Sequence, residues 1–536
     1  MSTRAWQFAA VLLTSVGLGL LGGCAGRRAT AVAPSTTAPA VELRAFWVDE
    51  FHVGIRTPQE AEQLVADAKR ANVNTLFVQV RGRADALYRQ SFEPPREDPA
   101  YDPAFDALAN IIEVAHRSGI EVHAWINAMP VWRDPQPPRD PRHVYNLHGP
   151  GHPGEDDWLT HSPTGETKFP VGYFLDPGHP AAAAYLAEVY LNIVRHYAVD
   201  GIHFDYIRYP ETDQSLPRGA TVGYNPTNLA RFRRATGRTD TPAPDDEQWT
   251  IWRRQQVTQL VRRVSIEARA INPRIKITAA VIAWGKPPHS EKDFADVAPM
   301  QRIFQDWHSW LKEGLLDMAV PMNYIRDADP ARREWFDGWI GWEKRHKHGR
   351  QLAVGMGAYL NPPPDTLAQI QRVRQPEGKY HADGVSFFSY ASLWAQQAPV
   401  GAASANAVPR AEPAKEDAPD RMSFLVNGAP PKPGAFASPA TIPPMDWIAR
   451  PTRGWVAGVV RDVSGQPVDG ARVALKSGGW FGATQRTVTD GNGYYGFSQL
   501  KPGRYRVRID SPAPRRAEAE VEVVAGRVAR AELVQP

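Results

Sequence analysis

The chain alternates short apolar runs with longer stretches in which apolar residues recur every three or four positions. The short runs are apolar almost throughout, which is typical of strands buried on both faces of a parallel sheet. The longer stretches predict helices with one buried side. The predicted strands are 43–49, 75–80, 121–128, 201–206, 276–283, 317–324, 352–359 and 384–390.

The helices predicted between these strands complete a repeating β/α unit. The first is expected after Thr57-Pro58, a capping residue followed by a proline that suits the first turn. The others are predicted at about 104–118, 181–198, 228–236, 247–270, 301–313, 330–346 and 364–373. Eight such units over residues 42–398 predict an α/β fold, the (β/α)8 TIM barrel.

An open doubly wound sheet is the alternative for such an alternation. It would carry a glycine-rich phosphate turn after the first strand, and the segment WVDEFHVG from Trp47 has no such pattern. Long segments at 129–180 and 207–227 follow the third and fourth strands. Because they leave the face where barrels bind their ligands, we expect them to surround the site.

The C-terminal part changes to a period of two. Residues 452–536 read as short strands separated by turn residues such as Asp490-Gly491-Asn492-Gly493, which predicts a small all-β sandwich. Residues 399–451 are rich in Ala and Pro and are expected to form a linker.

The N-terminus predicts export and a lipid anchor. Residues 1–23 are mostly apolar, and Leu21-Gly22-Gly23-Cys24 resembles the bacterial lipobox. We therefore expect a lipoprotein signal peptide over 1–23, lipidation of Cys24 and a flexible tether over 24–41. A plain secretory signal and an uncleaved membrane anchor are the alternatives. Ala25 favours a cell-envelope location on the outer membrane, facing the periplasm, if the cell is Gram-negative.

Composition removes several functional classes. The formal net charge is +4 with scattered basic residues, so no nucleic-acid partner is expected. No phosphate loop or nucleophile elbow is present, and four histidines between 143 and 161 lack a metal-binding spacing. We expect no metal, no cofactor and a monomer. The single cysteine rules out an intrachain disulfide.

The strongest candidate for chemistry is Asp205. It ends the fourth predicted strand in the run GIHFDYIRYP, residues 201–210, and the carboxyl ends of barrel strands are where catalytic groups lie. Glycoside cleavage needs one carboxylate that stabilises the oxocarbenium-like centre and a second acid that protonates the leaving oxygen. Asp205 suits the first role. The structural alternative is an ion pair with Arg208 that braces the rim of the barrel.

The run around Asp205 resembles the signature of the glycosyl hydrolase-like 10 family. So do LRAFWVD at 43–49, NTLFVQVRGRADALY at 74–88, AWINA at 124–128 and WLKEG at 310–314, and the resemblance covers about 42–395. It implies a TIM barrel of glycosidase type in a bacterial cell envelope, with peptidoglycan glycan strands as the substrate. Family members often have a second acid where this chain has Tyr206. The C-terminal module, from Gly458 to Val507, resembles the carboxypeptidase regulatory-like domains.

The sequence does not identify the second catalytic carboxylate. Glu50 and Asp85, after the first and second strands, are equal candidates, and Asp49 and Glu211 are weaker ones. Each can equally be a solvated loop acid or a salt-bridge partner. Expected substrate contacts are charged, amide or aromatic side chains at strand ends: Arg81, Arg83, Asn127, Tyr206, Arg208, Trp284, Asn323, Tyr324 and Tyr390, with Trp125 and Trp394 as further stacking candidates.

Two functional hypotheses follow from these residues. The first is a lipid-anchored glycoside hydrolase that uses two carboxylates on an envelope glycan. The second is a glycan-binding lipoprotein without activity, which the Tyr206 substitution motivates. A third reading, an esterase or deacetylase, has no supporting motif.

Overall fold

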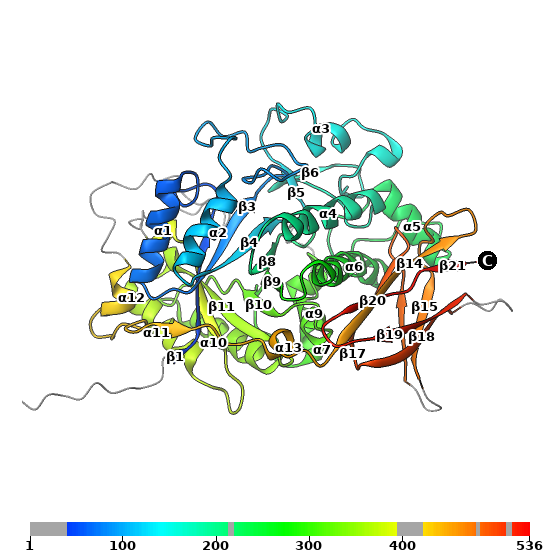
Figure 1. Ribbon diagram of the computed structural model, residues 1–536. Coiled ribbons are helices and arrows are strands. Elements are labelled where there is room, and N and C mark those ends of the chain that lie inside the picture. Colours follow the sequence, from blue (N-terminus) through cyan, green and yellow to red (C-terminus); the bar gives the residue numbers. More distant parts are fainter. Residues whose placement is uncertain (1–39, 213–218, 394–421, 479–482, 511–516, 536) are drawn as a thin grey trace, which may run out of the picture. The chain divides into compact units, whose positions relative to one another are not determined.

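The computed structural model describes residues 40–212, 219–393, 422–478, 483–510 and 517–535. Its main feature is a closed barrel of eight parallel strands, around which helices form an outer layer (Figure 1). The predicted fold class is therefore confirmed. Around the barrel the strands are β2 (Leu43–Val48), β3 (Thr75–Arg81), β4 (Glu121–Asn127), β8 (Gly201–Asp205), β9 (Lys276–Val281), β10 (Met318–Pro321), β11 (Gln351–Gly357) and β12 (Gly384–Phe388).

Alternate residues of these strands fill the inside of the barrel and the layer beneath the helices. Leu43, Ala45 and Trp47 belong to one apolar cluster, and Phe46 and Val48 belong to another. This is why the strands are apolar throughout. The longer helices are α1 (Pro58–Arg70), α2 (Ala107–Arg117), α4 (Pro180–His196), α5 (Pro226–Thr236), α6 (Glu247–Ile271), α10 (Pro330–Arg345) and α11 (Pro363–Arg374).

The helix predicted at 301–313 is the one clear departure among the helices. The chain instead forms two short helices, α8 (Ala298–Gln301) and α9 (Trp307–Lys312). Between them Phe304 has a φ of 56°, in the left-handed region that interrupts an α-helix. Its side chain is buried, so packing of Phe304 overrides the local helical pattern.

The long segment after β4 contains structure of its own. Strands β5 (Pro130–Trp132), β6 (Lys168–Phe169) and β7 (Gly172–Phe174) form a small antiparallel sheet, and α3 (Val144–His148) and the 3-10 turn η1 (Gly154–Asp156) lie between them. These strands are two or three residues long, too short for a period-two pattern to predict.

Part of the expected linker is packed on the barrel. It includes α12 (Ser423–Asn427), β13 (Ala440–Thr441) and α13 (Asp446–Ala449), and β13 pairs with β1 (Ala40–Val41). Leu425 and Phe436 are fully buried in the main apolar cluster. Two further 3-10 turns, η2 (Ala358–Leu360) and η3 (Ala391–Leu393), and the short α7 (Glu291–Phe294) complete the barrel part.

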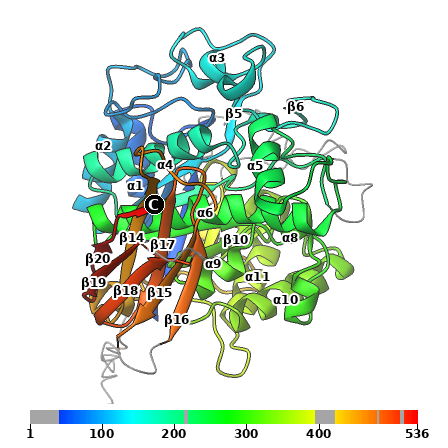
Figure 2. The same cartoon turned by 90° about the vertical axis from the view of Figure 1, so that its right-hand side faces the viewer.

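The C-terminal part is the predicted sandwich of two sheets (Figure 2). One sheet has the order β17-β14-β20, with β21 also paired to β14, and the other has the order β16-β15-β18-β19. The strands are β14 (Gly454–Asp462), β15 (Arg472–Ser477), β16 (Thr484–Val488), β17 (Tyr494–Leu500), β18 (Gly503–Ile509), β19 (Glu518–Val523), β20 (Val528–Arg530) and β21 (Leu533–Gln535).

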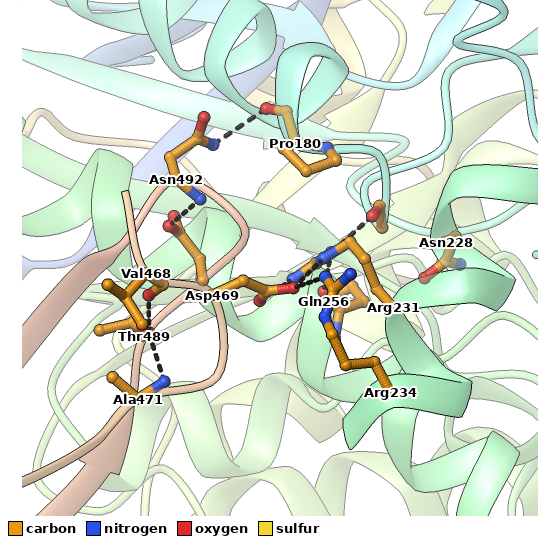
Figure 3. Close-up of polar contacts among 12 residues, drawn as sticks. Pro180, Asn228, Arg231, Arg234, Gln256, Val468, Asp469, Ala471, Thr489 and Asn492 are labelled. Atoms are coloured by element: carbon orange, nitrogen blue, oxygen red, sulfur yellow. Dashed lines mark hydrogen bonds and ion pairs between the residues drawn. The ribbon is translucent and has the colours of Figure 1, made fainter. Parts of the chain in front are cut away.

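Charged and apolar contacts join the sandwich to helices α5 and α6. Asp469 accepts hydrogen bonds from Arg231 at 2.8 and 2.9 Å and from Arg234 at 2.9 Å (Figure 3). Ile266 of α6 packs with Trp455 and Tyr494. Among the helices that the structure describes, none combines the length and the apolar character needed to cross a membrane.

Candidate active site

Asp205 lies at the end of β8, opposite Asn127 at the end of β4. Its carboxylate accepts hydrogen bonds from the indole of Trp125 at 3.1 Å, from the backbone N–H of Tyr206 at 2.6 Å and from Arg208 at 3.2 Å. The residue is only 5% exposed, and burial raises its pKa while Arg208 and the other donors oppose that rise. The three donors define an oriented carboxylate at the carboxyl end of the barrel.

The backbone at Tyr206 turns sharply after the strand. Its φ of 47° lies in the left-handed region, which costs a non-glycine residue about 1–3 kcal/mol. This turn brings the N–H of Tyr206 to the preceding carboxylate. It also lets the Arg208 guanidinium stack 4.1 Å from the Tyr206 ring, with Trp284 on another side at 6.0 Å. Tyr206, Arg208 and Trp284, all predicted from the sequence, therefore gather beside Asp205.

Arg208 also acts on a second acid, Glu211. Partial burial raises the pKa of Glu211, and the charges of Arg208 and Arg302 lower it. Arg208 has the same lowering effect on Asp205. Glu211 was a weaker candidate than Glu50 in the sequence, but the charge of Arg208 acts on it as it does on Asp205.

Aromatic rings border the site near the ends of β10 and β12. Tyr324 stacks on Phe388 at 5.5 Å, and Phe388 also meets Trp125 at 6.3 Å. Burial raises the pKa of Tyr324, and the charge of Asp205 adds to this shift, so the phenol lies within electrostatic reach of the carboxylate. Phe388 was not predicted, although its position at the end of a barrel strand is a signal that sequence reasoning can use.

A cluster of two acids, Glu50 and Asp85, with Arg96 lies just beyond the ends of β2 and β3. One nitrogen of Arg96, Nη1, donates to Glu50 at 2.8 Å and to Asp85 at 3.1 Å. Burial raises the pKa of Glu50 to about 7. Burial acts on Asp85 in the same direction, but Arg96, Arg83 and a backbone hydrogen bond together hold its pKa below its usual range. Glu50 is thus the acid that holds its proton near neutral pH.

The carboxylate of Glu50 lies against a glycine. A Cβ on Gly82 would stand 1.9 Å from Oε1 of Glu50, so any larger residue there would displace the Glu50 carboxyl group. The other oxygen, Oε2, is buried and accepts no hydrogen bond from the described residues. A protonated carboxyl explains this arrangement, because a neutral O–H costs less to bury without a partner than an ionised oxygen.

Asn127 lies between Asp205 and the segment that contacts Glu50. The Trp125 indole donates to Asn127 at 3.0 Å as well as to Asp205, and the Asn127 amide donates to the Gly82 carbonyl at 3.4 Å. Contacts therefore run from Asp205 through Trp125, Asn127 and Gly82 to Glu50. Such an arrangement can pair an oriented carboxylate with a neutral carboxylic acid.

The chain matches a known protein family. The family model described as Glycosyl hydrolase-like 10 matches residues 42–354, more than half of the sequence. The chain belongs to this family. The carboxypeptidase regulatory-like domain matches residues 456–534, so the two families recognised in the sequence are both confirmed in their order.

Curated relatives carry the same kind of description. Glycosyl hydrolase YngK of Bacillus subtilis is 25% identical over 348 residues, which cover 59% of this chain and 61% of the relative. Glycosyl hydrolase DigH of Escherichia coli strain K12 is 26% identical over 314 residues, which cover 53% of this chain and 64% of the relative. The chain therefore spans less than two thirds of the length of either relative.

Among solved structures, the glycoside hydrolase domain of PgaB (BpsB) from Bordetella bronchiseptica is similar to the barrel. The two are 15% identical with a TM-score of 0.46, and the match covers 66% of this chain and 95% of that chain.

Three of the expected substrate-binding residues have side chains that are engaged in contacts within the protein. Arg81 is fully buried, and its guanidinium donates to Glu93 at 2.8 Å and to main-chain carbonyls of Asn127 and Ala128. A guanidinium engaged in this way braces β3 and does not offer its donors to a sugar. The Arg81–Glu93 pair has no signal in the sequence, because the two residues lie in different structural segments.

Asn323 and Tyr390 are likewise committed to structural contacts. The Asn323 amide donates to both oxygens of Glu343 on α10 at 3.1 Å, and the Tyr390 hydroxyl donates to Asp67 on α1 at 2.8 Å. Both side chains point from the barrel toward surrounding helices. Their geometry does not support the sugar contacts expected from their positions near strand ends.

Arg83 is paired with an acid but remains partly exposed. It donates to Asp134 at 2.7 Å and stacks 4.9 Å from the ring of Trp132, and its side chain keeps some exposure. Asp49, a weaker acid candidate, accepts from the backbone of Phe51 and contacts His52 at 2.6 Å.

The four loop histidines have separate partners. His143 contacts the Arg83 carbonyl, His148 stacks on Trp158 at 3.5 Å, His152 contacts the Asn146 carbonyl and His161 contacts Asp157. Cys24 and Trp394, by contrast, lie outside the described residues.

Proposed function

We propose that this chain is a glycoside hydrolase that cleaves the glycan strands of peptidoglycan. Two observations carry the proposal: Asp205 is a carboxylate with three donors, and Glu50, at the same end of this glycosyl hydrolase-like barrel, is a buried carboxyl whose pKa is about 7. Two carboxyl groups with unlike environments are what glycosidic cleavage needs.

In this proposal Asp205 stabilises or traps the oxocarbenium-like centre. Its three donors favour the ionised form and fix its direction. Glu50 protonates the departing glycosidic oxygen, because with a pKa of about 7 about half of its molecules still carry the proton at neutral pH. Tyr206, Trp284 and Tyr324 offer partly exposed rings beside Asp205, on which sugar faces can stack.

The test uses peptidoglycan glycan strands freed of stem peptides. We expect the purified protein to release new reducing ends, and we expect Asp205→Asn and Glu50→Gln each to reduce the rate by about 100-fold or more. Asp200→Asn is the matched control, because Asp200 immediately precedes the same strand at its opposite end, where it contacts His116 and the Val122 backbone. Undiminished release by Asp205→Asn would remove this residue from the mechanism.

The second candidate is a glycan-binding protein without activity. It is favoured by Tyr206, which stands where the family often has a second acid. Binding of the same strands without release by the unmodified protein, at any pH from 5 to 8, would support it and refute hydrolysis by this site.

We further propose that Cys24 carries the lipid anchor and holds the protein in the cell envelope. The support is the lipobox-like sequence before the only cysteine. Radiolabelled palmitate should enter the unmodified protein in a bacterial host and not Cys24→Ser, which should also leave the membrane fraction. Equal labelling of both proteins would refute the anchor.

A further inference from the structure

A cavity of about 80 Å³ lies at the end of the barrel opposite Asp205. Asp317 and Arg350, which line it, immediately precede β10 and β11, whereas Asp205 ends β8. Trp455 and Gln499 of the sandwich line the cavity as well. It is therefore separate from the candidate active site and is built by both folded parts.

Arg350 brings into this cavity a charge that has no hydrogen-bonded acid among the described residues. The residue is only 9% exposed, and its guanidinium stacks 4.7 Å from the ring of Trp447. Within the described ranges, no hydrogen bond or ion pair joins this guanidinium to an acceptor. Burying a guanidinium without a hydrogen-bonded anion costs free energy, and a bound anion would reduce this cost.

The charge of Asp317 acts on Arg350, but the oxygens of Asp317 are hydrogen-bonded to other donors. One oxygen of Asp317 accepts from the Trp447 indole at 2.8 Å, and the other accepts from Arg269 and from the Ile277 backbone, both at 2.8 Å. Asp317 thus neutralises Arg269. Because four arginines line the cavity (Arg269, Arg274, Arg350 and Arg453) and Asp317 is the one acid lining it, the site has an excess of positive charge.

Two further residues that line the cavity carry donors. The indole N–H of Trp455 is buried without an acceptor among the described residues. The amide nitrogen of Gln499 and Nη2 of Arg350 lie 2.3 and 2.4 Å from where a Cβ on Gly314 would stand, so glycine leaves room for both. Gln499 has a φ of 57°, a strained backbone conformation that the structure maintains at this point.

We propose that this cavity binds an oxyanion, such as a phosphate, a sulfate or a carboxylate group. Arg350 supplies the charge, and the Trp455 indole and the Gln499 amide supply further hydrogen bonds. The volume exceeds that needed for a single water molecule and suits one small anionic group. Because the donors come from the barrel and the sandwich, the bound anion links the two and stabilises them together.

The experiment measures binding of inorganic phosphate and sulfate to the full chain by calorimetric titration in a chloride buffer. The unmodified protein should bind one anion, and Arg350→Gln should bind it at least 10-fold more weakly. The matched control is Arg332→Gln, because Arg332 also stacks on a tryptophan, Trp335 at 4.4 Å, and does not line the cavity. It should bind like the unmodified protein.

Thermal unfolding at constant ionic strength gives a second measurement. Phosphate should raise the melting temperature of the unmodified protein and of Arg332→Gln by a few degrees relative to chloride. A general salt effect would raise that of Arg350→Gln equally, and this outcome, or equal stabilisation by chloride, would overturn the proposal.

If Arg350→Gln fails to fold, phosphate binding is measured with Trp455→Phe instead. It keeps an aromatic ring and removes only the indole donor, so binding should weaken several-fold. Unchanged phosphate binding by this variant would overturn the role of Trp455. Neither measurement depends on hydrolysis, so failure of the proposed activity and failure of this site are distinguishable.

Discussion

Glu50 and Asp85 share one guanidinium, that of Arg96, yet their pKa values move in opposite directions. Burial acts on both carboxyl groups. Asp85 also receives the Arg83 backbone N–H at 3.0 Å, whereas one oxygen of Glu50 receives no donor from the described residues. The charge of Arg83 and this hydrogen bond help to hold the pKa of Asp85 down, and the charge of Asp85 in turn raises the pKa of Glu50.

The first prediction concerns the pH dependence of kcat/KM. If Glu50 is the general acid, kcat/KM should fall as pH rises above about 7, because Glu50 then loses its proton. Glu50→Gln should be slow and should lack this decline. A decline of the same position in the residual activity of Glu50→Gln would assign it to another group.

The same shift has a consequence for stability that does not depend on activity. The folded protein keeps the Glu50 proton up to a pH of about 7, whereas an unfolded glutamate loses it near 4.5. The folded state therefore binds more protons in this range, and Glu50 should make the free energy of unfolding fall as pH rises from 4.5 to 7. Chemical denaturation of Glu50→Gln should show a weaker decline.

The second prediction concerns Arg96. Arg96→Met leaves Glu50 and Asp85 buried without their cation, and it should lower the free energy of unfolding by about 3–5 kcal/mol at pH 7. Arg139→Met is the control, because the Arg139 side chain is 80% exposed in its pair with Glu97, and it should cost less than about 1 kcal/mol. Equal losses in urea denaturation would contradict the role given to Arg96.

At the scale of elements, the barrel strands are predicted within a few residues, because their apolar runs match burial on both sides. The helix at 301–313 and the small sheet after β4 were not predicted correctly. Both depend on long-range packing, as the left-handed Phe304 buried in the core shows. The local pattern of residues cannot reveal such contacts.

A third prediction tests how the loop after β4 is held. Asn225 caps α5, and its amide also donates to the carbonyls of Asp157 and Leu159 at 2.8 Å. Asn225→Ala should therefore cost about 2–3 kcal/mol of unfolding free energy, more than a cap alone. Thr57→Ala, which removes the exposed cap of α1, should cost about 1 kcal/mol. Equal costs would show that the two carbonyl contacts contribute nothing.

At the scale of the whole molecule, the sandwich is attached through specific contacts. Arg530 pairs with Glu267 of α6, Ser498 donates to the Glu313 carbonyl at 2.7 Å, and Asp469 pairs with Arg231. These contacts indicate that the barrel and the sandwich unfold together.

The fourth prediction follows from this coupling. Asp469→Ala leaves Arg231 buried without its carboxylate and should cost about 2–3 kcal/mol, less than a fully buried pair because the Asp469 side chain is 17% exposed. Differential scanning calorimetry should show the single transition broadening or separating into two. Asp510→Ala, which removes an exposed pair with Arg486, should leave the transition unchanged. An unchanged transition in both variants would mean that Asp469 does not couple the parts.

The barrel, the sandwich and the choice of Asp205 as the leading candidate follow from the sequence, because strand periodicity, turn residues and strand-end positions are local properties of the chain. Which other residues join Asp205 depends on how distant segments pack. This packing gathers Tyr206, Arg208 and Trp284 around Asp205, and it directs Arg81, Asn323 and Tyr390 to structural partners. Burial, and the contacts of Arg83 and Arg96 in the segment after β3, set the pKa values of Glu50 and Asp85, and the local pattern of residues does not contain these contacts.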